Sequence, residues 1–188
     1  MRWLKKLVSS LITKEEFWGI IGRSNQGRNL ADELSKLAED ELFGYHYWWN
    51  YFHRQAYKQD LWAVAYVVMG GCSDDGFIDF CNWLISRGKS VYMNACENAD
   101  SLCGEFEKLT DDDHDYPSQE ELAYVPMEVF KEKFDKDFYD AEFKAQEHIE
   151  FEETPFPSIT FEWEEDDEES IRKVCPHTFD KWLENDRF

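Results

Sequence analysis

The sequence predicts an all-α fold: a compact multi-helix domain with an irregular acidic C-terminal section. Three observations predict it. Apolar side chains recur at helical spacing along most of the chain, and no segment shows a convincing strand alternation. Apolar residues make up 43% of the sequence and aromatic residues 17%, which is too much hydrophobic content for a disordered chain. Near the C-terminus, Pro155, Pro157 and a run of acidic residues interrupt the helical pattern.

The length of 188 residues predicts one domain over residues 1–188. We expect residues 14–135 to form the helical core and residues 136–188 to form an acidic extension packed on it. A chain of this length buries enough surface to hold a core without a disulfide or a metal.

The first residues predict a short amphipathic helix over 2–12. Its apolar face consists of Leu4, Leu7, Val8, Leu11 and Ile12. This helix could pack on the domain, or it could contact a membrane surface or a partner. Thr13 and Glu16 then form the pattern of a capping box, with Thr13 at the N-cap, and predict the start of a second helix.

Three helical segments follow. A turn at 22–27 leads to a helix that Asn25 or Asn29 could cap. Residues 40–58 keep helical spacing and are strongly aromatic. Residues 61–69 are apolar nearly all round, which indicates a central buried helix.

Glycine and proline mark the remaining boundaries. Gly70 and Gly71 end the central helix, and Gly88 ends the next one, whose apolar face lies within 77–85. Further helices are expected over 91–99, over 120–139 with a boundary or kink at Pro126, and over 170–182 with a break at Pro176.

The net charge of −21 comes entirely from the second half of the chain. Residues 1–89 carry 11 basic and 11 acidic residues, whereas residues 90–188 carry 9 and 30. This balance argues against a direct nucleic-acid binder, which needs a basic face. The acidic runs are either solvated loops that keep the protein soluble or an electrostatic face for a basic protein partner.

Aromatic residues interleaved with the second acidic run favour the partner interpretation, because aromatic anchors among charges are typical of interfaces. The candidate partner-binding residues are Asp111, Asp112, Asp113, Phe161, Trp163, Glu164, Glu165, Asp166, Asp167, Glu168 and Glu169.

The loop between the two core helices carries the most distinctive polar pattern, Ser73-Asp74-Asp75-Gly76-Phe77. Ser73 or Asp74 could cap the second helix, with the carboxylates near its positive N-terminus. Alternatively, Asp74, Asp75 and Asp79 could bind Mg²⁺ or Ca²⁺, because Asp75 and Asp79 are four residues apart and share a helical face. The spacing does not match an EF-hand loop.

No catalytic motif is present, and we do not expect an enzyme. The nucleophile-elbow, P-loop, zinc-protease and dinucleotide patterns are all absent. His46 and His53 could share a helical face, either packed and hydrogen-bonded or as a ligand pair. No catalytic residue and no cofactor is assigned.

The first residues do not form a secretory signal, because their apolar part is too short and no cleavage site follows, and with the cysteine pattern this leads us to expect a cytoplasmic protein. The five cysteines are odd in number and form no CxxC pair, which indicates reduced thiols rather than a disulfide framework or a zinc site. The apolar run 61–72 is shorter than the ~20 residues of a transmembrane helix.

Several segments together resemble a bacterial family catalogued as domain of unknown function 4240. The most specific is 70–88, which reads Gly-Gly-Cys-Ser-Asp-Asp-Gly-Phe, then Asp79-Phe80, Trp83-Leu84-Ile85 and Gly88. Phe17-Trp18-x-Ile20-Ile21, the stretch 60–66 and the stretch 99–102 fit as well. The resemblance covers roughly residues 14–135 and implies a helical cytoplasmic bacterial domain. It implies no established activity, so it assigns no catalytic residue.

Two hypotheses of function follow. The first is a non-enzymatic acidic interaction protein, such as a bacterial immunity or inhibitor protein that masks a basic toxin. The second is a metal-dependent enzyme or small-ligand binder that uses the loop 73–77.

Overall fold

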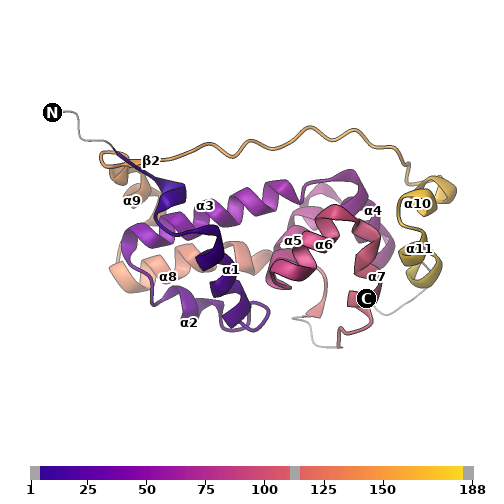
Figure 1. Ribbon diagram of the computed structural model, residues 1–188, viewed down its shortest axis with the longest axis horizontal. Helices are drawn as coiled ribbons and strands as arrows, with labels where there is room; N and C mark the ends of the chain where they lie inside the picture. Colours follow the sequence, from indigo (N-terminus) through magenta and orange to yellow (C-terminus); the bar gives the residue numbers. More distant parts are fainter. Residues whose placement is uncertain (1–4, 111–114, 184–188) are drawn as a thin grey trace. The chain divides into compact units, whose positions relative to one another are not determined.

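The computed structural model describes residues 5–110 and 115–183, and their secondary structure is almost entirely helical (Figure 1). The predicted all-α class is confirmed. In chain order the elements are β1 (Lys6–Leu7), η1 (Val8–Ser10), α1 (Lys14–Arg23), α2 (Leu30–Leu34), α3 (Glu39–Gln55), α4 (Gln59–Met69), α5 (Asp74–Ser86), α6 (Lys89–Glu97), η2 (Ala99–Leu102), α7 (Cys103–Phe106), η4 (Glu120–Ala123), α8 (Val125–Phe134), α9 (Phe138–Ala145), β2 (Ile149–Glu150), α10 (Glu168–Val174) and α11 (Pro176–Trp182).

Contacts within the chain divide it into two compact units, each built from two separate stretches of sequence. Unit 1 comprises Met1–Phe52 and Glu121–Pro155, and unit 2 comprises His53–Glu120 and Phe156–Phe188. The single domain over 1–188 stays a prediction.

The start of unit 1 corrects the helix predicted over 2–12. Within the described part of that segment, β1 pairs in parallel with β2, with Lys6 opposite Ile149, and the short 3₁₀ helix η1 follows. The amphipathic pattern is local, whereas the pairing partner lies more than 140 residues away and is invisible to helical periodicity. Val8 and Ile12 are nevertheless buried, as the pattern predicted.

The residues after η1 pack closely against α3 at Gly44. A Cβ atom on Gly44 would lie 2.9 Å from the Cβ of Leu11, so the close approach of this segment requires glycine there. The Nε1–H of Trp48 donates a hydrogen bond to the carbonyl oxygen of Ile12 at 3.0 Å. These contacts hold the segment against the first part of α3.

The start of α1 confirms the predicted capping box. The Thr13 hydroxyl accepts a hydrogen bond from the Glu16 N–H at 3.1 Å, and the Glu16 carboxylate accepts one from the Thr13 N–H at 2.6 Å. The predicted asparagine cap of α2 is wrong. Asn29 makes no side-chain capping bond, and Asn25 adopts a positive φ within the preceding turn.

The segment predicted as one helix over 120–139 is divided into three elements. Pro126 lies in the first turn of α8, where its missing N–H costs nothing. Asp135 ends that helix in the left-handed region, and α9 begins three residues later. The Phe43 ring of α3 lies 5.5 Å from the ring of Phe130 and 5.2 Å from that of Phe138, which places α3, α8 and α9 around one core.

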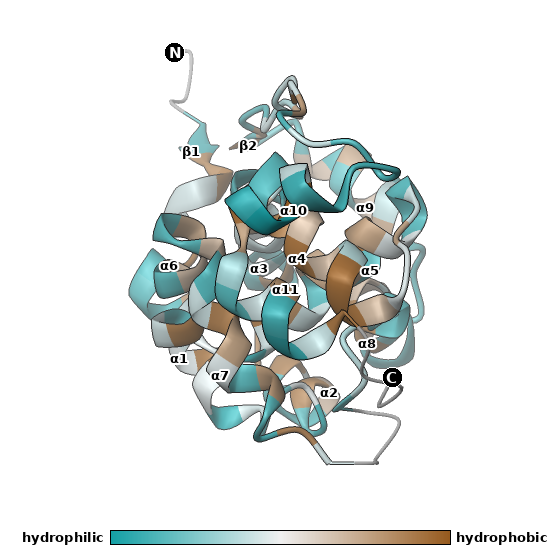
Figure 2. Cartoon of the chain, turned by 90° about the vertical axis from the view of Figure 1, so that its right-hand side faces the viewer, coloured by the Kyte–Doolittle hydropathy of each residue, from teal (hydrophilic) through white to brown (hydrophobic). Residues whose placement is uncertain are grey.

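Unit 2 is built around α4 and α5. Gly70 ends α4 in the left-handed conformation, as predicted. The Ser73 hydroxyl accepts a hydrogen bond from the Gly76 N–H at 3.2 Å and caps α5. A row of buried rings continues inward from α5 and consists of Phe77, Phe80, Trp83 and Phe106. Figure 2 accordingly shows α5 as largely hydrophobic and α10 as largely hydrophilic.

The C-terminal stretch is irregular over 151–167 and becomes helical after it. The break between α10 and α11 falls at Pro176, as predicted. Both helices pack on α4. The Asp100 carboxylate accepts hydrogen bonds from the N–H groups of His177 and Thr178, at 3.0 and 2.8 Å, and thereby anchors the start of α11.

All five cysteines are unpaired thiols, as predicted. Among the described residues, no helix has the length and apolar character that crossing a membrane requires.

Candidate functional site

The outer face of α4 in unit 2 carries half-buried aromatic rings. Trp62 stacks on Phe77 of α5, with ring centroids 4.6 Å apart and planes at 16°, and its Nε1–H donates to the carbonyl oxygen of Cys72 at 2.9 Å. Tyr57, just before α4, contacts both rings from the side. The two indole contacts hold Trp62 in one orientation and fix this face as a rigid platform.

The irregular segment after residue 155 adds two exposed rings to that platform. Phe156 lies 5.3 Å from the Tyr57 ring and is 54% exposed, and Phe161 lies 5.2 Å from the Trp62 ring and is 46% exposed. We call Tyr57, Trp62, Phe156 and Phe161 the aromatic strip. Phe161 was a candidate from the sequence and is accessible to a partner.

Trp163 does not have the surface position that an anchor needs. It is only 5% exposed, its ring lies 5.6 Å from that of Tyr66, and its Nε1–H donates to the carbonyl oxygen of Gln59 at 2.8 Å. The interpretation of Trp163 as a partner anchor is therefore corrected: the indole fastens the segment to α4. Sequence spacing placed it beside the charges but could not show which way it faced.

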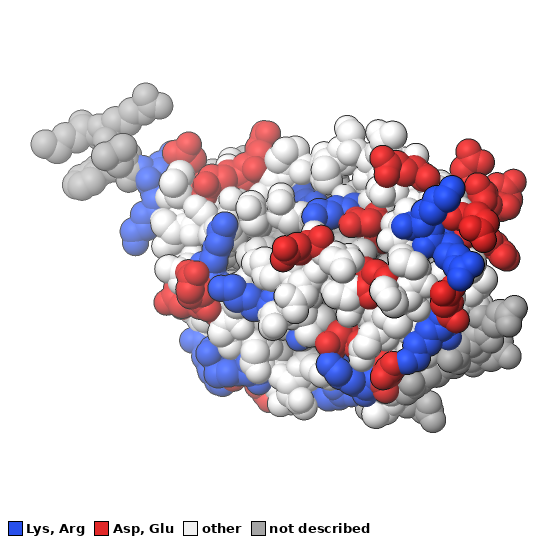
Figure 3. Space-filling model, turned by 45° about the vertical axis from the view of Figure 1, so that its right-hand side comes forward, with Lys and Arg blue, Asp and Glu red and all other residues white. Residues whose placement is uncertain are grey.

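An acidic stretch adjoins one end of the strip. We call Glu162 and Glu164–Glu169 the acidic run, and all of these side chains are exposed. Burial raises the pKa of Tyr66, and the neighbouring charges of Glu165 and Asp166 raise it further, so the run lies close to this ring of α4. In Figure 3 acidic side chains gather at the upper right, around α10.

The second part of the acidic run also starts a helix. The Asp167 carboxylate accepts a hydrogen bond from the Ser170 N–H at 3.3 Å and caps α10, and Glu168 and Glu169 occupy its first turn. Glu169 lies 3.8 Å from the guanidinium of Arg172. Glu162, Glu164, Glu165 and Asp166 precede the cap.

The loop 73–77 lies beside Tyr57 and Trp62 of the strip, because Phe77 contacts both rings. Asp74 and Asp75 are exposed in the first turn of α5, and Ser73 is its cap. Burial raises the pKa of Tyr57, and the charge of Asp74 adds to the increase, which places this carboxylate near the strip. Carboxylates from two separate segments, the loop 73–77 and the acidic run, thus lie near the strip.

The described residues contain no group of three or more His, Cys, Asp or Glu side chains that could hold a metal ion. Asp74, Asp75 and Asp79 are described, and they form no such group. Burial, with a smaller contribution from the Asp79 charge, raises the pKa of the nearby Cys72 thiol to about 12, so this thiol is not an activated nucleophile. His53 is buried and donates Nε2–H to the carbonyl oxygen of Ile78 at 3.1 Å, which fits the packed and hydrogen-bonded alternative of the two that its sequence position allowed.

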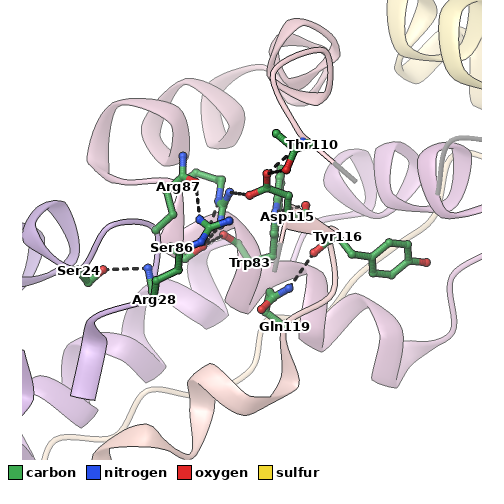
Figure 4. A network of polar contacts seen from close by, with 11 residues as sticks. Ser24, Arg28, Trp83, Ser86, Arg87, Thr110, Asp115, Tyr116 and Gln119 are labelled. Atoms are coloured by element: carbon green, nitrogen blue, oxygen red, sulfur yellow. Dashed lines mark hydrogen bonds and ion pairs between the residues drawn. The ribbon is translucent and has the colours of Figure 1, made fainter. Parts of the chain in front are cut away.

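The candidates Asp111, Asp112 and Asp113 lie outside the described residues. The residues that flank them belong to a tight polar network (Figure 4). The Asp115 carboxylate accepts hydrogen bonds from the Thr110 N–H at 3.0 Å and hydroxyl at 2.7 Å, and its other oxygen lies 3.6 Å from the Arg87 guanidinium. The side chains of Arg87 and Asp115 are both buried, and the Arg87 guanidinium also lies over the Trp83 ring. This network ties Thr110 to Asp115.

Comparison with known proteins finds a family model that matches most of the chain. The model of the family described as "Protein of unknown function (DUF4240)" matches residues 12–132. The chain belongs to this family. No curated protein and no solved structure matches the chain significantly.

The DUF4240 match contains only part of the candidate site. It includes α4, the loop 73–77 and two members of the aromatic strip, Tyr57 and Trp62. Phe156, Phe161 and the acidic run follow the matched residues. Sequence reasoning missed Tyr57 and Trp62 as surface residues because their helical spacing is equally typical of a core. Their joint position with Phe156 and Phe161 is a tertiary feature.

Proposed function

We propose that this DUF4240 chain is a non-enzymatic interaction protein whose unit 2 binds a basic protein partner. The observation that carries the proposal is the presence of two exposed phenylalanines, Phe156 and Phe161, on an aromatic platform that has carboxylates of two segments near it. Exposed aromatic side chains that adjoin a charged border are typical of interface hot spots.

The two parts of the surface contribute to different steps of binding. The acidic run attracts a basic surface over long range and accelerates association, an effect that salt screens. The aromatic strip contributes at contact, where Arg or Lys side chains of the partner can stack on its ring faces. The chain itself provides an example, since the Arg54 guanidinium lies 4.8 Å from the Phe156 ring centroid.

A concrete form of the proposal is a cytoplasmic immunity or inhibitor protein that masks a basic toxin. A nuclease needs a basic surface for its phosphate-rich substrate. An acidic, aromatic surface that covers it would exclude the substrate without any chemistry. The net charge of −21 supports this class of partner.

The test separates the contribution of the acidic run to binding from that of the aromatic strip. A partner is first captured on the full chain from lysate of the source organism at low salt and eluted by rising salt. Association is then measured for the combined variant Glu162→Gln, Glu164→Gln, Glu165→Gln and Asp166→Asn, which leaves the Asp167 cap intact. We expect association about tenfold slower with a flatter salt dependence.

A matched control removes the same charge from exposed positions of unit 1: Glu128→Gln, Glu132→Gln, Glu147→Gln and Glu153→Gln. If the two combined variants associate at equal rates, the acidic run has no special role. Replacing Phe156 and Phe161 by Ser should instead raise the dissociation rate. We expect each replacement to weaken the binding free energy by about 1–2 kcal/mol.

The second hypothesis, a metal-dependent enzyme or small-ligand binder that uses the loop 73–77 with Mg²⁺ or Ca²⁺, is supported by no specific observation. It predicts that the cation raises the melting temperature and that Asp75→Asn abolishes the increase.

A further inference from the structure

Unit 1 contains a pocket that the proposed function does not use. It has a volume of about 250 Å³ and lies between α3, α9 and the segment 151–154. Phe43, Tyr47 and Phe151 supply aromatic walls, and Glu142 and Glu152 supply carboxylates. Pockets for drug-sized ligands have volumes of about 300–1,000 Å³, so this one suits a single head group.

The pocket has an electrostatic preference for cations. Its lining contains two glutamates and neither Lys nor Arg. One carboxylate is already held in place, because Glu152 accepts a hydrogen bond from the Ser9 N–H at 3.0 Å. The other, Glu142, is half-buried, and burial alone raises its pKa. Among the described residues we find no hydrogen bond to its side chain, so the cost of desolvating this carboxylate is not offset by a hydrogen bond.

His46 lies near Glu142 but is too far away to form a hydrogen bond with it. The Nδ2 of Asn50 lies 3.0 Å from the Nε2 of His46. Because an amide nitrogen can only donate, Nε2 is the acceptor, and a neutral ring carries its proton on Nδ1. Nδ1 lies 4.0 Å from the Glu142 Oε1, too far for a hydrogen bond. The carboxylate therefore keeps acceptor capacity for a group that enters the pocket.

We propose that this pocket binds a guanidinium group. A guanidinium is planar and stacks on aromatic rings, and it donates two parallel hydrogen bonds to one carboxylate. Tyr47 and Phe151 offer the rings, and Glu142 offers the carboxylate. Tyr139, which does not line the pocket, is 55% exposed and has its ring 6.5 Å from that of the lining residue His46. The proposal goes beyond the proposed function, because the pocket belongs to unit 1 and the aromatic strip to unit 2.

The test titrates the full chain with blocked tripeptides and follows the Asn50 side-chain amide by nuclear magnetic resonance. The three peptides are acetyl-Gly-Arg-Gly-amide, its lysine analogue and its citrulline analogue. Citrulline keeps the shape and loses the charge. We expect saturable shifts with arginine and binding about 10- to 100-fold weaker with citrulline, the ratio for a hydrogen bond to a charged group. Equal binding of lysine or citrulline, or no shift with arginine, overturns the proposal.

Variants locate the site. Glu142→Gln keeps the size of the side chain and should weaken arginine binding about 10- to 100-fold. The control Glu147→Gln changes an exposed glutamate of the same unit and should leave binding unchanged. The amide spectrum of each variant verifies the fold. Undiminished binding by a folded Glu142→Gln variant overturns the assignment.

Free arginine distinguishes the two sources of a guanidinium. Binding of the blocked peptide as tight as that of free arginine indicates an arginine side chain of a protein. Tighter binding of the free amino acid indicates a small molecule. This comparison is made only after the arginine peptide has been shown to bind, and either result then identifies the source of the guanidinium group. Neither depends on a partner for unit 2, so this proposal and the proposed function can fail separately.

Discussion

Unit 2 has acidic residues in two opposite surroundings: some are buried in the fold, and those of the acidic run are exposed to solvent. Asp100 and Asp115 are buried, and each accepts hydrogen bonds from more than one group. The residues of the acidic run are exposed, and those before Asp167 make no ion pair among the described residues. A buried charge must be paired to be tolerated, whereas an exposed one interacts weakly with its neighbours.

This difference separates stability from function. Removing a buried carboxylate leaves its partner desolvated and uncompensated, so it should destabilise the fold. Removing an exposed one should hardly change the free energy of unfolding and leaves only its effect on a partner. The acidic run can therefore be changed in binding experiments without unfolding the protein, provided that the Asp167 cap is kept.

The largest expected effect is at Asp115. Asp115→Ala removes the carboxylate that lies 3.6 Å from the buried Arg87 guanidinium, together with both hydrogen bonds from Thr110. We expect a loss of about 3–5 kcal/mol in the free energy of unfolding, measured by urea denaturation. The exposed Glu165→Ala serves as the control and should change it by less than about 0.5 kcal/mol. A loss below about 1 kcal/mol for Asp115→Ala would mean that the buried and the exposed carboxylate contribute alike to stability, which contradicts the expected difference between them.

A smaller effect, dependent on pH, is expected at Asp100. Burial alone would raise the pKa of Asp100, but hydrogen bonds from the Thr178 and His177 N–H groups and from the His177 side chain outweigh it and lower the pKa. A lowered folded pKa means that the stabilisation is fully present above the unfolded pKa of about 3.9 and is lost as the pH falls through the folded value.

Asp100→Asn should therefore lose about 2 kcal/mol at pH 7. The difference between the variant and the wild-type chain should shrink as the pH falls below about 4. Urea denaturation of both proteins at pH 7 and at pH 3 measures it. A constant difference would show that the carboxylate's charge contributes nothing at this position.

The smallest effect distinguishes two neighbours within the acidic run. Asp167→Ala removes the N-cap of α10 and should cost about 1 kcal/mol. Asp166→Ala removes the same charge from an adjacent exposed position and should cost less than about 0.5 kcal/mol. Thermal unfolding of the two variants in parallel measures the difference. Equal melting temperatures would mean that the cap adds nothing and that Asp167 can join the charge-removal variants.

The sequence predicted the helices best where their ends are determined by neighbouring residues. The capping box at Thr13, the cap at Ser73 and the end of α4 at Gly70 are all confirmed. Each depends on hydrogen bonds or on a backbone conformation within about one turn of the residue concerned. The boundaries at Pro126 and Pro176 were predictable for the same reason, because proline lacks an N–H wherever it occurs.

Prediction failed where a distant segment decided the outcome. The helix expected over 2–12 became β1 and η1 because Lys6 and Leu7 pair with residues 149–150. Trp163 was expected at a surface and is buried because α4 offers a carbonyl oxygen for its indole N–H. Neither partner is near in the sequence, so no local pattern could reveal it.

The sequence by itself determined the helical class, several helix ends and the concentration of negative charge in the second half, and its resemblance to a known family indicated the family. The class, the helix ends and the charge follow from composition and from interactions between residues a few positions apart. Only the tertiary structure decided that Phe156 and Phe161 join Tyr57 and Trp62 in one strip, and that Glu142 faces His46 across a pocket. Each of these groupings joins residues about 100 positions apart, and whether such a side chain is buried or exposed depends on packing that periodicity does not specify.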